Sequence, residues 1–357
     1  MKKAILTAAF SLFAAIVISC GNSGNGNITK GNSSKLDTLS YAIGIDLANG
    51  LKRGLGDIKL NNELLVKGLE AAGMGKESVK CGDLAITKEV TDSVLMNYFR
   101  NTLSQRMQAI RINERAKADT TGTVEPVEID FDPETMFAGE EERSIISTAY
   151  GFDMGNNLAK NQFALQLCWL VKGLEDAWAE DTKMSYDEVQ DYLRDYLTVK
   201  IPAENKAESE KWLAKIEKKS GVKKTESGLL YKIIEEGDAN MKPAAADVVK
   251  VHYKGTTRKG VVFDASRFED MPAERQEQMK LYSPDSYKED TPVEFPLNRV
   301  IKGWTEGVQL IGKGGKIQLW IPAELAYGAR GAGANIGPNE ALYFEVELID
   351  IVVPAQK

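Results

Sequence analysis

The chain has 357 residues, of which 43% are hydrophobic, so it is long and apolar enough to build the cores of two or three domains. Its 45 Lys and Arg are outnumbered by 52 Asp and Glu, which gives a formal net charge of −7. Phosphate groups are bound by cationic surfaces, so this balance argues against a nucleic acid as a partner.

The amino terminus has the features of an export signal. Two lysines follow the initiating methionine and precede an apolar run that is too short to span a membrane but is typical of a signal peptide, predicted over residues 1–19. The run ends in Val17-Ile18-Ser19-Cys20, which resembles the lipobox of bacterial lipoproteins. That resemblance implies that Cys20 is lipidated and that the membrane is a partner. A plain signal peptide with a chance cysteine is the alternative.

Residues 20–35 are mostly Gly, Asn and Ser, a composition that predicts a flexible tether between the lipid anchor and the folded chain. No acidic run follows Cys20. By resemblance to the usual sorting pattern, we expect a lipid-anchored protein of the cell envelope, at the outer membrane and facing the periplasm.

Two further cysteines, Cys81 and Cys168, lie far apart in the sequence. They could pair in an oxidising compartment. We favour the other interpretation, in which Cys168 is a small apolar residue buried in a helix.

The tether is followed by an internal repeat. Residues 41–51 match residues 148–158, and the pattern Val-Lys-Gly-Leu-Glu at 66–70 recurs at 171–175. Further matches join Glu89-Val90 to Glu188-Val189, and Tyr98-Phe99 to Tyr196-Leu197. A three-helix unit therefore occurs twice in the same order. We predict repeat 1 at 36–118, an acidic linker at 119–143 and repeat 2 at 144–202.

Spacing and capping residues support the predicted helices. Apolar residues recur at every fourth position in Leu39, Ile43, Leu47 and Leu51, which is typical of one helix face. Ser185 and Glu188 form the pattern of a capping box for the third helix of the second copy. A long polar helix is predicted just after Pro202, as a connecting helix over 203–220.

From residue 221 onward the periodicity changes to short β-rich runs separated by Gly and Pro. Strands are predicted at 229–234, 248–253, 261–263, 316–321 and 342–352, with one short helix near 300–309. The predicted fold class is α+β: an all-α region of two repeats and a connecting helix, followed at 221–357 by a curved antiparallel sheet around one helix.

Five blocks of this terminal segment resemble the FKBP family in order and spacing. They are residues 251–255 (VHYKG), 260–266 (GVVFDAS), 300–307 (VIKGWTEG), 321–328 (IPAELAYG) and 342–348 (LYFEVEL). The resemblance implies a peptidyl-prolyl cis/trans isomerase that needs no cofactor and no metal. Its partners would be unfolded or partly folded exported proteins that contain X-Pro bonds.

The resemblance also implies roles for individual residues. Trp304 would be the floor of an apolar cup, and its walls would be Tyr253, Phe263 and Phe344. A second set would grip the proline ring and the residue before it: Val300, Ile301 and Ile336. Asp264 and Tyr327 would complete the catalytic set with Trp304, Tyr327 by offering its hydroxyl to a substrate carbonyl and Asp264 by orienting the twisted amide.

Two features of this segment need separate interpretation. His252 is the only histidine, and strand alternation predicts that it faces away from Tyr253, so we expect a structural role and not acid–base catalysis. Residues 267–291 are longer than the corresponding segment of a minimal FKBP domain, and their composition predicts a partly helical flap. The sequence leaves the role of this flap open.

Each helical copy resembles the amino-terminal domain of many secreted bacterial FKBPs, in which the helices of two subunits intertwine. Two copies in one chain depart from that pattern. We expect the copies to pack on each other within a monomer, and a homodimer through the helical region is the alternative. The alternative function is a membrane-anchored chaperone or binding module with little isomerase activity.

Overall fold

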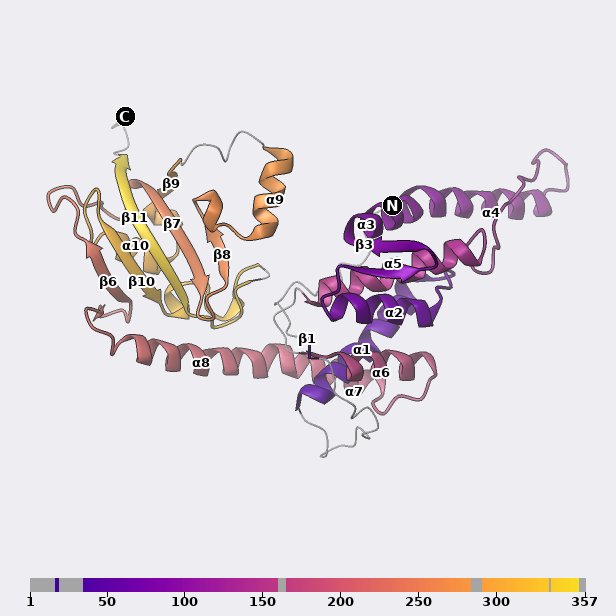
Figure 1. Cartoon of the computed structure of the whole chain (residues 1–357), viewed down its shortest axis with the longest axis horizontal. Helices are drawn as coiled ribbons and strands as arrows, with labels where there is room; N and C mark the ends of the chain where they lie inside the picture. Colours follow the sequence, from indigo (N-terminus) through magenta and orange to yellow (C-terminus); the bar gives the residue numbers. More distant parts are fainter. Residues whose placement is uncertain (1–16, 19–34, 160–164, 284–290, 334, 353–357) are drawn as a thin grey trace. The chain divides into compact units, whose positions relative to one another are not determined.

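The structure is a computed structural model that describes residues 17–18, 35–159, 165–283, 291–333 and 335–352 (Figure 1). The predicted lipidation site Cys20, the tether and most of the signal peptide lie outside the described residues. The chain divides into two compact units, Met1–Arg194 and Asp195–Lys357. No helix among the described residues combines the length and apolar character needed to cross a membrane.

The first copy of the repeat begins the first unit. It consists of α1 (Lys35–Leu55), α2 (Asn62–Gly73), a hairpin of β2 (Ser78–Cys81) and β3 (Leu84–Thr87), α3 (Lys88–Asn97), a π-helical turn (Tyr98–Thr102) and α4 (Leu103–Ala118). The side chains of Asn61 and Thr87 accept hydrogen bonds from the first turns of α2 and α3, so both helices begin at a capping residue. Cys81 is a free thiol, which excludes a bridge to Cys168. Cys168 lies in a helix as expected, but it is half-buried and disulfide-bonded, so its interpretation as a buried, unpaired residue is wrong.

The second copy repeats this order of helices. It comprises α5 (Glu140–Ala159), α6 (Leu167–Trp178), α7 (Tyr186–Asp195), a second π-helical turn (Tyr196–Lys200) and α8 (Ile201–Ile216). A short strand, β4 (Leu165–Gln166), precedes α6 and pairs with β1 (Val17–Ile18). The capping box before α7 is confirmed, because Ser185 N–H donates to Glu188 and Glu188 N–H donates to Ser185 Oγ.

The two copies exchange their helix partners. The first helix of each copy packs on the second helix of the other, α1 on α6 and α2 on α5. Glycines make both contacts close: a Cβ on Gly44 would lie 2.0 Å from the carbonyl oxygen of Leu170, and one on Gly151 would lie 1.8 Å from that of Leu65. In the repeat, Gly44 corresponds to Gly151 and Leu170 corresponds to Leu65, so the two contacts are equivalent.

The segment that links the two copies is packed against the first copy. Its apolar residues Phe131, Met136 and Phe137 are buried. The ring of Tyr98 stacks on Phe137 at 5.2 Å, and both the Tyr98 hydroxyl and Arg106 donate to the carbonyl of Met136. These three apolar residues fix the segment against the third helix of the first copy, although its overall composition is acidic.

The expectation that a helix starts after Pro202 is wrong. Helix α7, the π-helical turn and α8 follow one another without a break from Tyr186 to Ile216, and Pro202 lies in the first turn of α8. In the π-helical turn, the Ile201 N–H donates to Tyr196, one residue beyond the α-helical partner. The hydrogen-bond pattern already changes at this point, so the missing N–H of proline is tolerated.

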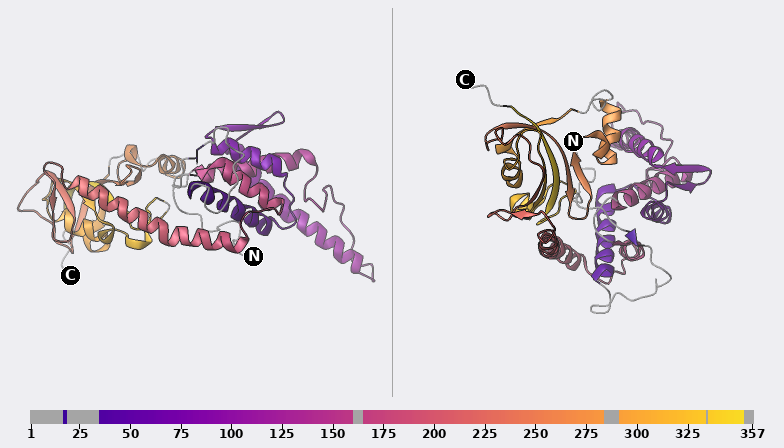
Figure 2. Two further views of the ribbon diagram at one scale, coloured as in Figure 1. Left: turned by 90° about the horizontal axis from the view of Figure 1, so that it is seen from below. Right: turned by 60° about the vertical axis from the view of Figure 1, so that its left-hand side comes forward.

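The second unit contains an antiparallel sheet in the order β5-β6-β10-β11-β7-β8, with β9 paired to β7. Its strands are β5 (Lys223–Lys224), β6 (Leu230–Glu235), β7 (Val248–Thr257), β8 (Val262–Ala265), β9 (Val293–Pro296), β10 (Lys316–Ile321) and β11 (Leu342–Val352). The sheet curves around the short helix α10 (Lys302–Val308), as Figure 2 shows. A second helix, α9 (Ala273–Tyr282), confirms that the insertion between β8 and β9 is partly helical.

The two faces of this sheet bury different sets of residues. On the inner face, Phe344 of β11 pairs with Gly255 of β7 and Leu319 of β10. Leu319 and Phe344 belong to the main core, and Gly255 lies against the Phe344 ring. One position earlier, Tyr343 pairs with Thr256 and Trp320 on the outer face. Three residues of α8 pack on Trp320 and Leu230 there: Trp212, Leu213 and Ile216. Strand alternation thus separates a concave inner core from an outer surface that α8 covers.

Candidate functional site

A cluster of aromatic rings lies on the inner face of the sheet. Trp304, on α10, meets the edges of two rings from the strands: Tyr253 at 5.2 Å and Phe344 at 5.3 Å between centroids. Phe263 of β8 contacts Phe344 in the same edge-to-face manner at 5.5 Å. The structure therefore brings the predicted floor and the three predicted walls together. Edge-to-face contacts orient each ring and so give the cluster a fixed shape.

A further aromatic residue belongs to this cluster and was missed in the sequence. Phe295 of β9 lies 5.6 Å from both Trp304 and Tyr253, and its ring is close to perpendicular to each. The signal was weak, because β9 has only four residues and follows a long insertion. The alternation of Val293 and Phe295 was the one available indication.

Two glycines of α10 allow Trp304 to reach the centre of the aromatic cluster. A Cβ on Gly303 would lie 2.4 Å from Ile321, and one on Gly307 would lie 2.5 Å from Leu319, so the helix approaches β10 more closely than other residues would permit. Trp304 is consequently only 4% exposed. The predicted gripping residues contact the same core: Ile336 is buried, and Val300 and Ile301 are half-buried.

Asp264 lies at the end of the aromatic cluster on β8. Its Oδ2 accepts a hydrogen bond of 2.7 Å from the Tyr253 hydroxyl, and its Oδ1 accepts one of 3.0 Å from the Ala265 N–H. Arg275, from the inserted helix α9, pairs with Oδ1 at 3.3 Å. Burial, and then the hydrogen bond to Asp264, raise the pKa of Tyr253. Tyr253 therefore stays a neutral donor that fixes the orientation of the carboxylate.

Tyr327 differs from the other aromatic residues because it keeps access to solvent. It is 40% exposed, and within the described part of the chain its hydroxyl has no hydrogen-bond partner. Burial of part of the ring, and then the charge of Asp264, raise the pKa of Tyr327 above its usual value. The side chain is thus a protonated donor that is free to bind a ligand.

His252 is placed apart from the cup. It precedes Tyr253 on β7 and is buried, and its Nδ1 lies 3.1 Å from Ser266 Oγ. Ser266 Oγ also accepts a hydrogen bond from the Tyr253 N–H. This arrangement ties two segments of backbone together and agrees with a structural role.

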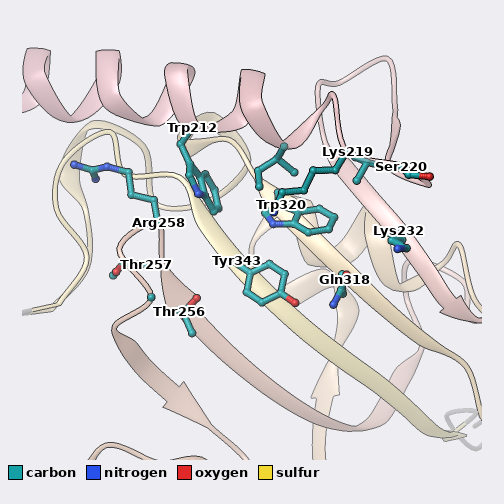
Figure 3. A pocket seen from close by; sticks show the side chains of 13 residues that line it. Trp212, Lys219, Ser220, Lys232, Thr256, Thr257, Arg258, Gln318, Trp320 and Tyr343 are labelled. Carbon is teal, nitrogen blue, oxygen red and sulfur yellow. The ribbon is translucent and has the colours of Figure 1, made fainter.

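A groove of about 590 Å³ lies behind the sheet, between α8 and the outer face (Figure 3). Its aromatic lining comes from Trp212 of α8, Trp320 of β10 and Tyr343 of β11. Since Tyr343 points outward where Phe344 points inward, the groove and the aromatic cup are on opposite faces of one sheet.

Comparison with protein families gives two matches. Residues 239–349 match the family described as FKBP-type peptidyl-prolyl cis-trans isomerase. Residues 143–233 match the domain amino terminal to FKBP-type peptidyl-prolyl isomerase. The first match spans the aromatic cup, and the second spans α5 to α8.

Individual relatives agree with these matches. The FKBP-type isomerase FkpA of Aeromonas hydrophila is 40% identical over 58% of this chain and 75% of its own length. FkpA of Escherichia coli strain CFT073 is 32% identical over 74% of this chain and 94% of its own length. The outer membrane protein MIP of Legionella longbeachae is 32% identical over 58% of this chain and 84% of its own length.

Among solved structures, the crystal structure of Escherichia coli FkpA is 35% identical, covers 54% of this chain and 84% of its own, and has a TM-score of 0.38. The sequence relationship extends over nearly the whole of one curated relative. The chain therefore belongs to the family of FKBP-type peptidyl-prolyl cis-trans isomerases.

Proposed function

We propose that the aromatic cup around Trp304 catalyses rotation about X-Pro peptide bonds. The observation that carries this proposal is one arrangement: an apolar floor and aromatic walls, with Asp264 bonded to Tyr253 and the free hydroxyl of Tyr327 within reach of the charge of Asp264. Rotation about a peptide bond loses amide resonance and meets a barrier of about 18–20 kcal/mol. A twisted amide carries less charge on its carbonyl oxygen than a planar one, so a dry cup favours the twisted state over the hydrated planar state.

Each residue has a part in this mechanism. Proline packs on Trp304, and the three aliphatic side chains of Val300, Ile301 and Ile336 hold the ring and the residue before it. The Tyr327 hydroxyl donates a hydrogen bond to a substrate carbonyl, which fixes the chain while the bond turns. Asp264, held by the Tyr253 hydroxyl, orients the rotating amide. No covalent bond is formed or broken.

A matched pair of tyrosine variants tests this assignment. Tyr327→Phe removes the donor at the cup, whereas Tyr343→Phe removes a hydroxyl that bonds Glu345 on the outer face. In a coupled peptide assay, we expect Tyr327→Phe to lower kcat/KM about tenfold, the equivalent of ~1.4 kcal/mol of lost hydrogen bonding, and Tyr343→Phe to leave it unchanged. Trp304→Leu should reduce turnover further. Full turnover in both Trp304→Leu and Tyr327→Phe would refute the site.

The alternative function is binding of unfolded chains without isomerisation. The variant Asp264→Ala distinguishes this function from catalysis. We expect this variant to bind a proline peptide with nearly unchanged affinity, because the apolar walls remain, but to turn it over slowly. If Asp264→Ala retains full turnover, the carboxylate has no part in the reaction.

We propose further that the helical unit makes within one chain the pairing that two subunits make in related proteins. The support is the equivalence of the contacts: α1 on α6 and α2 on α5, each through the corresponding glycine. The apolar faces of both copies are then already covered, so the protein is a monomer. Light scattering tests this, and a stable dimer at micromolar concentration would contradict it.

The natural substrates are, we propose, exported proteins that fold in the cell envelope, with the enzyme held at the outer membrane by lipid on Cys20. Support comes from the lipobox resemblance and from a relative named as an outer membrane protein. Cys20→Ser should move the protein from the membrane to the soluble fraction after cell lysis. If the variant stays in the membrane fraction, the anchor is elsewhere.

A further inference from the structure

The loop that follows Tyr327 supplies one side of the cup from an unusually flexible sequence. Residues 328–341 contain four glycines and carry Ile336 into the main core, where it is 4% exposed. Three of these glycines have positive φ angles, at Gly328, Gly331 and Gly333. Glycine loses more backbone freedom on ordering than any other residue, so such a loop needs contacts from outside to hold one conformation.

Helix α8 provides these contacts. Ser209, buried on α8, donates through its hydroxyl to the carbonyl of Asn339 at 3.0 Å and accepts from the Ala341 N–H at 3.0 Å. Asn205, one turn earlier, donates to the carbonyl of Pro338 at 3.0 Å. The helix therefore holds the backbone of three loop residues, close after Ile336.

A buried ion pair completes the connection. Arg258, in the turn after β7, bonds Glu340 of the loop at 2.5 Å and also bonds Asn205 and Glu208 of α8. The side chains of Arg258 and Glu340 are 5% and 3% exposed. The second oxygen of Glu340 accepts the Gly337 N–H at 3.3 Å. Burial raises the pKa of Glu340, and the charge of Arg258 opposes this.

The energy of such a pair does not explain its presence. Moving two charges out of water costs about as much as their attraction returns, and apolar replacements of both partners are often as stable. What the pair adds is a defined geometry. The Arg258 guanidinium bonds both α8 and the Glu340 carboxylate, and this carboxylate accepts the N–H of Gly337, next to Ile336. The same part of the loop is also tied to the residue after Tyr327, because the Asn339 N–H donates a hydrogen bond of 2.8 Å to the carbonyl of Gly328.

We propose that α8 is part of the catalytic unit, with Ser209 and the Arg258–Glu340 pair as positioning residues for Ile336 and Tyr327. This inference rests on the proposed isomerase site. A residue that acts only through position changes substrate affinity and turnover without touching the substrate. Helix α8 thus does more than connect the helical copies to the sheet.

The first test uses Ser209→Ala in the full chain, with Glu210→Ala as the control. Glu210 is the exposed neighbour on the same helix. We expect Ser209→Ala to raise KM for a proline peptide roughly tenfold, with kcat reduced less, at temperatures well below the unfolding transition. Ser209→Thr keeps the hydroxyl and should restore KM. Unchanged KM in Ser209→Ala would overturn the proposal.

The second test separates position from stability. Arg258→Met alone leaves a buried, unpaired carboxylate and should destabilise the catalytic unit. Arg258→Met combined with Glu340→Met should restore the melting temperature, but it lacks the bond to Gly337, so KM should stay raised. A double variant with both wild-type stability and wild-type KM would refute the positioning role. If Trp304→Leu retains turnover as well, the isomerase site itself fails; if Trp304→Leu loses turnover, only the role of α8 fails.

Discussion

Alanine at Gly44 and alanine at Gly50 should have opposite effects, although both glycines lie in α1. A Cβ at Gly44 would lie 2.0 Å from the Leu170 carbonyl oxygen, whereas one at Gly50 would have no atom within 4 Å. Carbon and carbonyl oxygen require about 3.3 Å, so Gly44→Ala has to separate α1 from α6 by more than about 1 Å. Overpacking of this kind costs roughly 1–3 kcal/mol.

The helix preference of alanine offsets only part of this cost. We expect a net loss of about 2 kcal/mol in the free energy of unfolding for Gly44→Ala, against a gain of about 0.5–1 kcal/mol for Gly50→Ala. The chain has two units, so hydrogen exchange of peptides from α1 and α6 isolates the helical unit better than a global melt does. Gly151→Ala should behave like Gly44→Ala. If Gly44→Ala is as stable as Gly50→Ala, the close helix contact is not required.

Three other predictions concern the catalytic unit. The raised pKa of Tyr327 means that its hydroxyl stays protonated to a higher pH than usual, so kcat/KM should be flat from about pH 6 to about pH 9; a fall in rate as the pH rises from about 7 to about 9 would contradict a Tyr327 donor. A chain that begins at Asp195 keeps α8 and should retain peptide turnover, whereas one that begins at Gly221 should lose most of it; equal rates of the two in the coupled assay would refute this. Arg275→Ala breaks an exposed pair with Asp264 and should lower the melting stability by less than about 1 kcal/mol; a larger loss on thermal unfolding would show a structural role for the flap.

The long strands and the predicted cup residues could be found from the sequence. In β10 and β11 the inward residues alternate strictly, as Leu319 and Phe344 illustrate, and the predicted bounds agree with those of the structure. Strands β5 and β9 were missed because β5 has only two residues and β9 is a four-residue strand that follows a long insertion. Phe295 was not predicted as a site residue because its strand, β9, was not predicted.

The role of α8 was harder to predict. Its composition is polar, and Ser209, Trp212, Leu213 and Ile216, which contact the sheet and the loop, occupy the i, i+3, i+4 and i+7 positions of one helix stripe. The sequence contains this stripe, but the many charged residues of α8 hide its apolar periodicity. The packing of the segment 119–143 was not predicted for the same reason, because its three buried apolar residues are surrounded by many acidic ones.

Covalent linkage of the two helical copies changes how their pairing responds to dilution. Two separate subunits with interlocked helices come apart as their concentration falls, and their stability cannot be stated without it. Here α1 and α6 belong to one polypeptide, so their association is a first-order process with a fixed equilibrium constant. The two helical copies would therefore stay paired at any protein concentration, even where a compartment holds a single molecule.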